Sequence, residues 1–345
     1  MSQKDIDDAL SIYKAVYGEC DEKKFMIKHT QNPYEIKRTL LIRYEENIPV
    51  GVNAFMGMVL IESGREHLIA QSNDTAVLHS QRGKGLFTSI IIEFESDDNE
   101  TEYCIGLPNE QSYPGFMKMG WEKVSDLVHY VLICKPGRLA LGNSGVSKVI
   151  DVPFRMIDKA RKRITLYRVK QKVNNRSTEK EYRVERNDSV VFTQQEYDLI
   201  NADIDVGTKR EEKIYNWKLS DKECIQYKLY DKQNLAGFFI IKKEKRMRGI
   251  SAVVYDWMII GRAQRFQKMK TLIDNIEKEY DLIEFRTVNR SNRDDTGLLK
   301  LVGGIDICKK PFTYRGSPLI VSGRYKGDYI CRFAFRYIDA DTVMN

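Results

Sequence analysis

The stretch 68–95 constrains the fold most, because it predicts a strand and a helix joined by a short basic turn. Residues 68–77 mix apolar and β-branched side chains over the length of a strand. The residues after Gly85 place apolar side chains at helical spacing, at Leu86, Ile90 and Phe94. The turn between them reads Arg-Gly-Lys-Gly, residues 82–85. Such a turn leaves the first backbone N–H groups of the helix unpaired, and with the helix dipole and two cations they favour a bound phosphate.

Three known phosphate-binding loops can be compared with this turn. A P-loop is excluded, because Leu78 and Gly85 stand where it requires glycine and Ser/Thr. A dinucleotide fingerprint lacks its third glycine, since Thr88 occupies that position. A third pattern, Arg/Gln-x-x-Gly-x-Gly/Ala, is matched by Arg82 and Gly85, with Phe87 in place of the final small residue. The alternative to this third pattern is an ordinary strand–turn–helix whose turn is basic but binds no phosphate.

The third pattern is the pyrophosphate loop of the GNAT acyltransferases, and the chain resembles that superfamily beyond the loop. A predicted helix, a hairpin and a further strand precede the turn, in the order of the GNAT fold. Downstream, that family has a strand, an Asn, a short helix and a Tyr-x-x-x-Gly-Phe ending. Here these positions are Asn109, Phe116 in place of the tyrosine, and Gly120-Trp121. The resemblance implies an α/β fold with a mixed sheet.

The second half of the chain repeats the first in order and pattern, which indicates a duplicated domain. A predicted hairpin, strand, turn and helix recur between 224 and 280, and residues 298–303 resemble the stretch that ends at Gly120. We therefore expect a GNAT-like domain at 1–136, a basic connector at 137–187 and a second, degenerate GNAT-like domain at 188–345. The second turn has a single glycine, Gly261, so the cofactor is expected in the first domain.

Composition places few limits on function, but the charge is unevenly distributed. The 345 residues suffice for two domains, and 42% hydrophobic with 30% charged residues is typical of globular proteins. The net charge of +7 is concentrated in residues 155–186, which hold twelve Lys/Arg and four Asp/Glu. This segment predicts either a solvated connector or weak peripheral contact with anionic lipid. Nucleic-acid binding there is disfavoured, because aromatic side chains are sparse.

The cysteines and histidines favour a cytoplasmic protein without a metal centre. The six cysteines are scattered and form no C-x-x-C pair, which favours reduced core thiols. The four histidines show no metal-ligand spacing. The N-terminus lacks a signal-peptide core, and the longest apolar run is too short to cross a bilayer.

The resemblance implies a binding site for acetyl-CoA, the expected acyl donor. The backbone of the turn and the helix start would hold the pyrophosphate, with charge from two side chains, and a strand edge would pair with the pantetheine arm. The implied cofactor-binding residues are Val77, Leu78, His79, Arg82, Gly83, Lys84, Gly85, Leu86, Phe87 and Asn109.

Catalytic and acceptor residues follow from the same resemblance. Asp74, on the strand before the turn, is the expected general base or water-orienting residue. Phe116 has no proton to donate, so Tyr113, one helical turn earlier, is the candidate acid for the CoA thiolate, and the alternative is that Tyr113 packs in the core or lines the acceptor pocket. Phe25, His29 and Tyr34 are expected to line the acceptor side.

The expected function is direct transfer of an acyl group from acyl-CoA to an amine acceptor. The chain resembles tandem GNAT-like proteins of bacterial polysaccharide loci, which suggests an amino-sugar or polysaccharide precursor as acceptor. A tandem GNAT-like protein that binds CoA without turnover is an alternative. An aminoacyl transferase of the FemABX group is another, because residues 328–341 resemble the terminal strand and acidic tail of that group.

Overall fold

The computed structural model describes most of the chain and divides it into two compact units. The described residues are 1–18, 20–96, 101–142, 144–172, 181–220, 222–247, 249–288, 293–306 and 318–322. Unit 1 contains Met1–Leu127, Ile204–Ser220 and strand β13, and unit 2 contains Val128–Asp203 and the segment from β8 to β12. The division differs from the expected boundaries, because two later segments of the chain belong to unit 1. The expected terminal strand at 328–341 lies outside the described residues.

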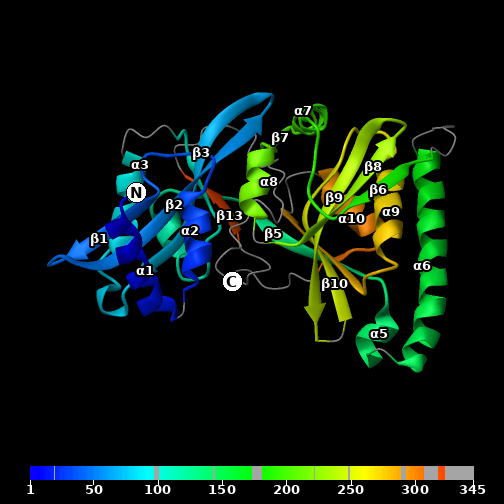
Figure 1. Cartoon of the computed structure of the whole chain (residues 1–345), viewed down its shortest axis with the longest axis horizontal. Coiled ribbons are helices and arrows are strands. Elements are labelled where there is room, and N and C mark those ends of the chain that lie inside the picture. Colours follow the sequence, from blue (N-terminus) through cyan, green and yellow to red (C-terminus); the bar gives the residue numbers. More distant parts are fainter. Residues whose placement is uncertain are drawn as a thin grey trace. The chain divides into compact units, whose positions relative to one another are not determined.

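Unit 1 is a mixed sheet covered by helices on both faces (Figure 1). Its sheet follows the order β1-β2-β3-β4-β13-β5, and β7 pairs with β2. The bounds of these strands are β1 Leu40–Glu45, β2 Ile48–Glu62, β3 Arg65–Val77, β4 Cys104–Gly106, β5 Glu122–Ile133, β7 Val206–Thr208 and β13 Pro318–Val321. The helices are α1 Gln3–Tyr17, α2 Glu22–Thr30, α3 Leu86–Ser96, α4 Tyr113–Lys118 and α8 Glu212–Lys218, with a 3₁₀ turn at His79–Gln81.

Strand β2 carries the two cores of unit 1, one on each face. Val52 packs under α1 with Ile6 and Tyr13, whereas Phe55 packs under α3 and stacks on Phe94 at 3.6 Å between ring centroids. Residues 52 and 55 are three apart, so their side chains point to opposite faces of the sheet. Helices α1 and α3 therefore cover opposite faces.

Two insertions complete unit 1 from distant parts of the sequence. Strand β13 lies between β4 and β5, where Ile320 pairs with Gly106. Strand β7 pairs with the end of β2, and the Trp217 indole in α8 donates to the Ile27 carbonyl at 2.9 Å. The sequence pattern missed both insertions, since β7 and β13 are only three and four residues long.

Unit 2 repeats the meander–helix–strand–helix–strand order of unit 1. Its sheet follows the order β5-β11-β10-β9-β8-β6, with β12 paired to β5, and β10 and β11 are parallel. The strands are β6 Arg183–Asn187, β8 Cys224–Asp231, β9 Asn234–Arg246, β10 Gly249–Ile259, β11 Leu282–Val288 and β12 Ile305–Asp306. The helices are α5 Pro136–Leu141, α6 Gly145–Lys172, α7 Gln194–Ala202, α9 Arg265–Ile276 and α10 Arg293–Leu301.

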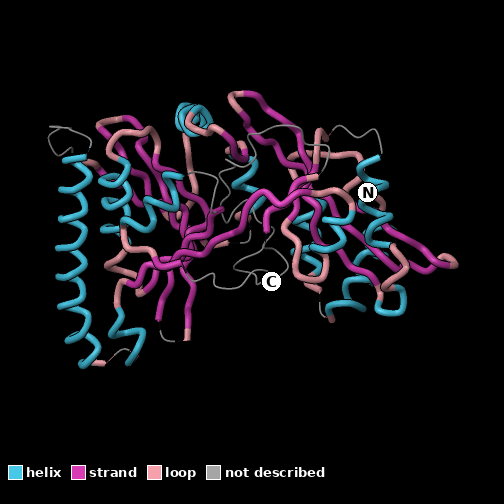
Figure 2. The backbone as a smooth tube through the Cα atoms, turned by 180° about the vertical axis from the view of Figure 1, so that it is seen from behind, coloured by secondary structure: helices cyan, strands magenta, loops and turns pink. Residues whose placement is uncertain are grey.

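The core of unit 2 lies between the sheet and α9. Phe266, Met269 and Ile273 of α9 pack on β9, β10 and β11, with Trp257 and Phe285 in edge-to-face contact at 5.6 Å. The expected connector at 137–187 contains helix α6, which runs beside α9 in this unit (Figure 2). Within the described residues, none of the helices is both long and apolar enough to span a membrane.

Candidate functional site

The two parallel strands of unit 1 separate after a short ladder, and a cavity opens between them. Strands β3 and β4 pair from Ala70/Cys104 to Ser72/Gly106, and the pairing ends there. A cavity of about 970 Å³ follows, lined by the end of β3, the 82–88 turn, α4 and residues of α1 and α2. Because the strands no longer satisfy each other beyond Ser72, the backbone of β3 has an edge on which an extended ligand can form strand-like hydrogen bonds.

A β-bulge at Asp74 produces part of this separation. Asn73 pairs with Ala54 of β2 and Ala76 pairs with Val52, so β3 has one residue more than its partner in this interval. Asp74 adopts a φ of 45°, in the left-handed region that aspartate tolerates better than most side chains. The bulge bends β3 and turns the Asp74 side chain toward α2.

Asp74 lies in a buried ion pair rather than in solvent. Its Oδ2 accepts a very short hydrogen bond from Lys28 Nζ and a second, at 3.0 Å, from His29 Nε2. The exposed fractions of the Lys28 and Asp74 side chains are 1% and 8%. Burial alone would raise the pKa of Asp74, but the Lys28 ammonium and the His29 hydrogen bond outweigh burial and hold that pKa well below its usual range.

Two tyrosines of α1 satisfy the carbonyls of the bulge. The Tyr13 hydroxyl donates to the Asp74 carbonyl at 2.5 Å, and the Tyr17 hydroxyl donates to the Thr75 carbonyl at 2.6 Å. Both tyrosines line the cavity, and burial raises the pKa of Tyr17. The sequence-based prediction gave neither tyrosine a part in the site. Lys28 was also missed, because nothing in its local pattern marks a buried lysine.

The glycine turn ends at the start of α3, as the sequence predicts. Gly83 and Gly85 adopt φ angles of 83° and 77°, and a Cβ at either residue would point into open space. The Gly85 carbonyl accepts the first helical bond from the Ser89 amide at 2.9 Å. Gly85 has no side chain to cap the helix, and residues 86–88, whose amides have no carbonyl partner within α3, line the cavity.

The two cations of the turn lie differently. Arg82 lines the cavity, and its Nε donates to the Val77 carbonyl at 3.3 Å. Lys84 does not line the cavity, because its ammonium pairs with Glu45 at 3.1 Å, at the end of β1. Of the two cations expected at the phosphate, the structure therefore brings only Arg82 to the cavity.

Val77 is the last residue of β3, and Leu78 and His79 follow it into the 3₁₀ turn. The Leu78 amide donates to the Val50 carbonyl of β2 at 3.0 Å. Val77, one residue earlier, therefore directs its amide to the opposite edge, and it lines the cavity. His79 begins the 3₁₀ turn and is exposed outside the cavity lining.

Asn109 and Phe116 also line the cavity, in roles that packing and capping explain. The Asn109 side-chain oxygen accepts from the amides of Gln111 and Ser112, at 3.1 and 3.0 Å, and so supports the start of α4. Phe116 is buried and contacts Phe87 edge-to-face, with 5.0 Å between ring centroids. The aromatic residue that departs from the loop pattern, Phe87, thus packs on the aromatic residue that replaces the family tyrosine.

Several residues expected at the site lie outside the cavity lining. Tyr113 is half-buried against the core beneath α3 and α4. Phe25 is fully buried beside Tyr13, with 5.7 Å between ring centroids. The Tyr34 hydroxyl donates to Glu211 at 3.3 Å, and burial raises its pKa above the ordinary value. Of the expected acceptor residues, Phe25 and His29 are turned toward the sheet by α2, as a core residue and an ion-pair partner, and Tyr34 is buried beyond the end of that helix.

The corresponding turn of unit 2 is occupied by its own side chains. The Gly261 amide donates to the Asp203 carboxylate at 3.1 Å, and the buried Lys268 ammonium donates to the Ile260 carbonyl at 2.6 Å. Arg265 pairs with the buried Asp295 at 2.7 Å. The amide and cations that could meet a phosphate there already have partners within the unit.

The described cysteines and candidate metal ligands form no further reactive site. Cys104, Cys134 and Cys224 are buried thiols, and burial raises the pKa of Cys134 to about 12. No group of three or more His, Cys, Asp or Glu able to hold a metal ion occurs among the residues that the structure describes.

The structure resembles solved acyltransferase structures, whereas sequence comparison finds nothing. No family model and no curated protein matches the chain. A GCN5-related N-acetyltransferase from Anabaena variabilis superposes with a TM-score of 0.62 at 14% identity, covering 93% of this chain and 70% of its own. A conserved protein of unknown function from Enterococcus faecalis gives 0.62 at 11% identity with the same coverages. A GCN5-related N-acetyltransferase from Kribbella flavida gives 0.57 at 11%, covering 93% and 69%.

These likenesses extend over nearly the whole chain, so both units take part in the shared architecture. At sequence identities of 11–14%, these likenesses establish the fold of the chain and not its activity. The chain therefore has an α/β fold of two tandem GNAT-like units, the fold of GCN5-related N-acetyltransferases.

Proposed function

We propose that the protein is an acyl-CoA-dependent N-acyltransferase whose donor site is the cavity of unit 1. The single observation that supports this most is the end of β3–β4 pairing at Ser72/Gly106, with the cavity running from there to the turn at Gly83–Gly85. One end of the cavity offers a strand edge and the other offers helix amides. A pantetheine arm and a pyrophosphate require that pair of features in that order.

The donor is held mainly by backbone groups. The pyrophosphate accepts from the free amides at the start of α3 and from Arg82, while the pantetheine amides pair with the edge of β3 at Val77. Lys84 adds charge only after leaving Glu45, with which it forms an exposed ion pair. Such a pair contributes less than about 1 kcal/mol, so binding of a diphosphate can replace it.

The reaction is a direct transfer. The amine nitrogen attacks the thioester carbonyl, the C–N bond forms, the C–S bond breaks, and the CoA thiolate leaves while the amine loses its proton. The low pKa of Asp74 makes it a poor proton acceptor but a permanent hydrogen-bond acceptor. We therefore assign Asp74 the orienting role, toward the attacking amine or a water molecule, and leave the acceptance of the proton to water.

Calorimetry with acetyl-CoA tests the donor site. An Arg82→Ala, Lys84→Ala double variant is expected to bind acetyl-CoA at least about tenfold more weakly, because two charge-assisted contacts are lost. Arg65→Ala, Lys123→Ala is a matched control, since both residues are exposed and lie outside the cavity, and Lys123 also pairs with a carboxylate. Equal affinity in the two double variants would refute the donor site.

A thiol-release assay over a panel of amines tests turnover and acceptor class. We propose an amino-sugar or polysaccharide precursor as acceptor, which the sequence resemblance suggests. The second candidate is a protein that binds CoA without turnover, and the observation that favours it is Phe116, buried against Phe87 and Trp121 where the family has a tyrosine. Binding of acetyl-CoA without thiol release from any amine would select this second candidate.

A further inference from the structure

Helix α6 in unit 2 has an unusual distribution of side chains: Leu166 packs against the core, but its most buried described side chains are polar and most of its apolar side chains are exposed. The residues that it buries include Ser147, Asp151 and Lys162, with exposed fractions of 1%, 5% and 2%. A helix that packs on a domain ordinarily buries its apolar stripe. The exposed apolar side chains of α6 therefore either contact a binding partner or destabilise the protein by remaining in water.

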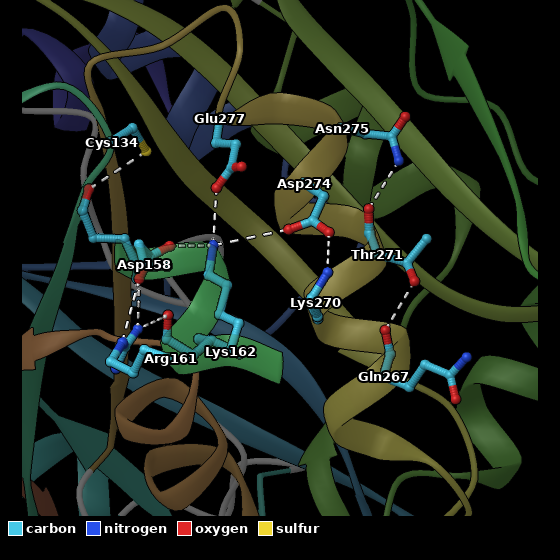
Figure 3. A network of polar contacts seen from close by, with 12 residues as sticks. Cys134, Asp158, Arg161, Lys162, Gln267, Lys270, Thr271, Asp274, Asn275 and Glu277 are labelled. Carbon is cyan, nitrogen blue, oxygen red and sulfur yellow. Dashed lines mark hydrogen bonds and ion pairs between the residues drawn. The ribbon is translucent and has the colours of Figure 1, made fainter. Parts of the chain in front are cut away.

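Polar contacts hold this helix on its unit (Figure 3). The Lys162 ammonium lies 2.8 Å from both Asp158 and Glu277, the latter just beyond α9. Arg161 donates to the Val302 carbonyl at 3.0 Å, and the Asp151 carboxylate accepts from the Gly137 amide at 2.6 Å. These contacts fix the rotation of α6 about its axis, so its outward face is determined by the structure.

The outward face is an apolar stripe, defined here by Val146, Val149, Met156, Ile157, Ile164 and Tyr167. The intervals of three and seven residues, at 146–149, 149–156, 157–164 and 164–167, place these side chains along one side of a helix. Their exposure is high: 72% for Val149, 68% for Met156 and 63% for Tyr167. Contiguous apolar surface of this kind on a protein marks an interaction site.

Cations flank the apolar stripe, and carboxylates are kept from it. Lys148, Arg155, Lys159 and Arg163 are all exposed on this helix. The acidic residues among its described side chains are Asp151 and Asp158, and both point toward the unit, where they accept hydrogen bonds. The outward surface of α6 therefore combines apolar groups with positive charge that neither described carboxylate of the helix accompanies.

We propose that this face of α6 binds the surface of an anionic lipid bilayer. An apolar stripe bordered by cations suits the interface, where apolar side chains enter the acyl boundary and cations meet lipid phosphates. A second copy of the chain would bring two cationic borders together, which charge repulsion opposes. A nucleic acid would leave the apolar stripe without a partner.

Flotation of the full-length protein with vesicles tests the proposal. We expect binding to vesicles of equal parts phosphatidylcholine and phosphatidylglycerol at low salt, with little binding to phosphatidylcholine alone. Val149→Gln, Met156→Gln should lower the partition coefficient about tenfold or more, because two buried apolar groups are lost. Lys159→Glu, Arg163→Glu should lower it by at least as much, and added salt should weaken wild-type binding.

Matched variants separate the face from general surface effects. Ile92→Gln, Met247→Gln removes two other exposed apolar side chains, and Lys243→Glu, Lys245→Glu reverses two other exposed lysines of unit 2. Both controls should float as wild type does. The proposal is overturned by failure to float with anionic vesicles, or by equal loss in variants and controls. Self-association in the absence of vesicles that Val149→Gln, Met156→Gln abolishes, without flotation, assigns the face to a second copy and also overturns it.

Discussion

At the scale of single residues, the ion pair between Lys28 and Asp74 connects the stability of unit 1 with its cavity. Both side chains are nearly inaccessible to solvent, and the pair lies at the bulge where β3 turns away from β4. A buried ion pair costs desolvation when it forms, but removing one partner leaves an uncompensated charge. Replacing either partner alone is therefore expected to destabilise unit 1.

Asp74→Asn should destabilise the protein by about 3–5 kcal/mol, because the Lys28 ammonium would remain buried without its counter-charge. Urea unfolding near neutral pH measures the change in the free energy of unfolding. Asp126→Asn is the control, since Asp126 pairs with Lys123 at 2.7 Å in the open and should cost less than about 1 kcal/mol. A loss for Asp74→Asn no larger than that of the control would contradict the buried pair.

The same pair predicts acid sensitivity. The pKa of Asp74 is lower in the folded protein than in the unfolded chain, so its stabilising effect is fully present above the unfolded value of about 4. That effect declines as pH falls below about 4, toward the folded pKa. The difference in unfolding free energy between wild type and Asp74→Asn should therefore shrink in urea titrations between about pH 5 and pH 3. A difference that stays constant over this range would show that Asp74 is not ion-paired.

At the residue scale, the sequence identified one member of this pair and not the other. Asp74 was found because it precedes the turn on a predicted strand. Lys28 was not, because a lysine on a short helix is ordinarily solvated, and only the packing of α2 on the sheet buries it.

At the scale of elements, close approach of backbones limits which glycines can be replaced. A Cβ at Gly57 of β2 would lie 2.3 Å from the Tyr34 carbonyl oxygen, so the segment before β1 can pack there only against glycine. Gly297 in α10 has no atom within 4 Å of the corresponding position. The two positions test opposite effects of one substitution.

Gly57→Ala should destabilise the protein by about 1–3 kcal/mol through overpacking, whereas Gly297→Ala should stabilise it by about 0.5–1 kcal/mol through helix propensity. Thermal or urea unfolding of both variants measures the two signs. Changes of the same sign would mean that the close approach at Tyr34 does not limit the strand.

The order of elements in unit 1 was predictable, but the neighbours of β4 were not. Alternating and helical patterns reveal strands and helices that bury their own faces. Strand β13 reaches its place between β4 and β5 from more than two hundred residues away, as the Cys104 amide donating to Ser322 shows. A four-residue strand carries too little pattern to reveal such a partner.

At the scale of the whole molecule, the two units share an order of elements but differ at the turn before the main helix. Unit 1 has two left-handed glycines there, followed by a helix start that lines the cavity, whereas in unit 2 Asp203 and Lys268 bond to the backbone at the same place. Both units therefore have the same order of strands and helices, but only in unit 1 does the turn before the main helix line a cavity among the described residues.

We expect one acetyl-CoA per chain by calorimetry, since the open turn occurs in unit 1. Arg262→Ala, at the unit 2 turn, should leave affinity within about twofold of wild type, whereas Arg82→Ala should weaken binding about tenfold. Two sites per chain, or an equal effect of the two substitutions, would contradict the difference between the units.

The sequence alone determined the mixed α/β class, the repeated order of elements and the glycine turn before α3, because these follow from side-chain periodicity and local backbone freedom. Only the tertiary structure decided which residues face the cavity, that Lys28 neutralises Asp74, and that α6 turns its apolar side outward. Those properties depend on burial and on contacts between distant segments, and the pattern of neighbouring residues does not record them.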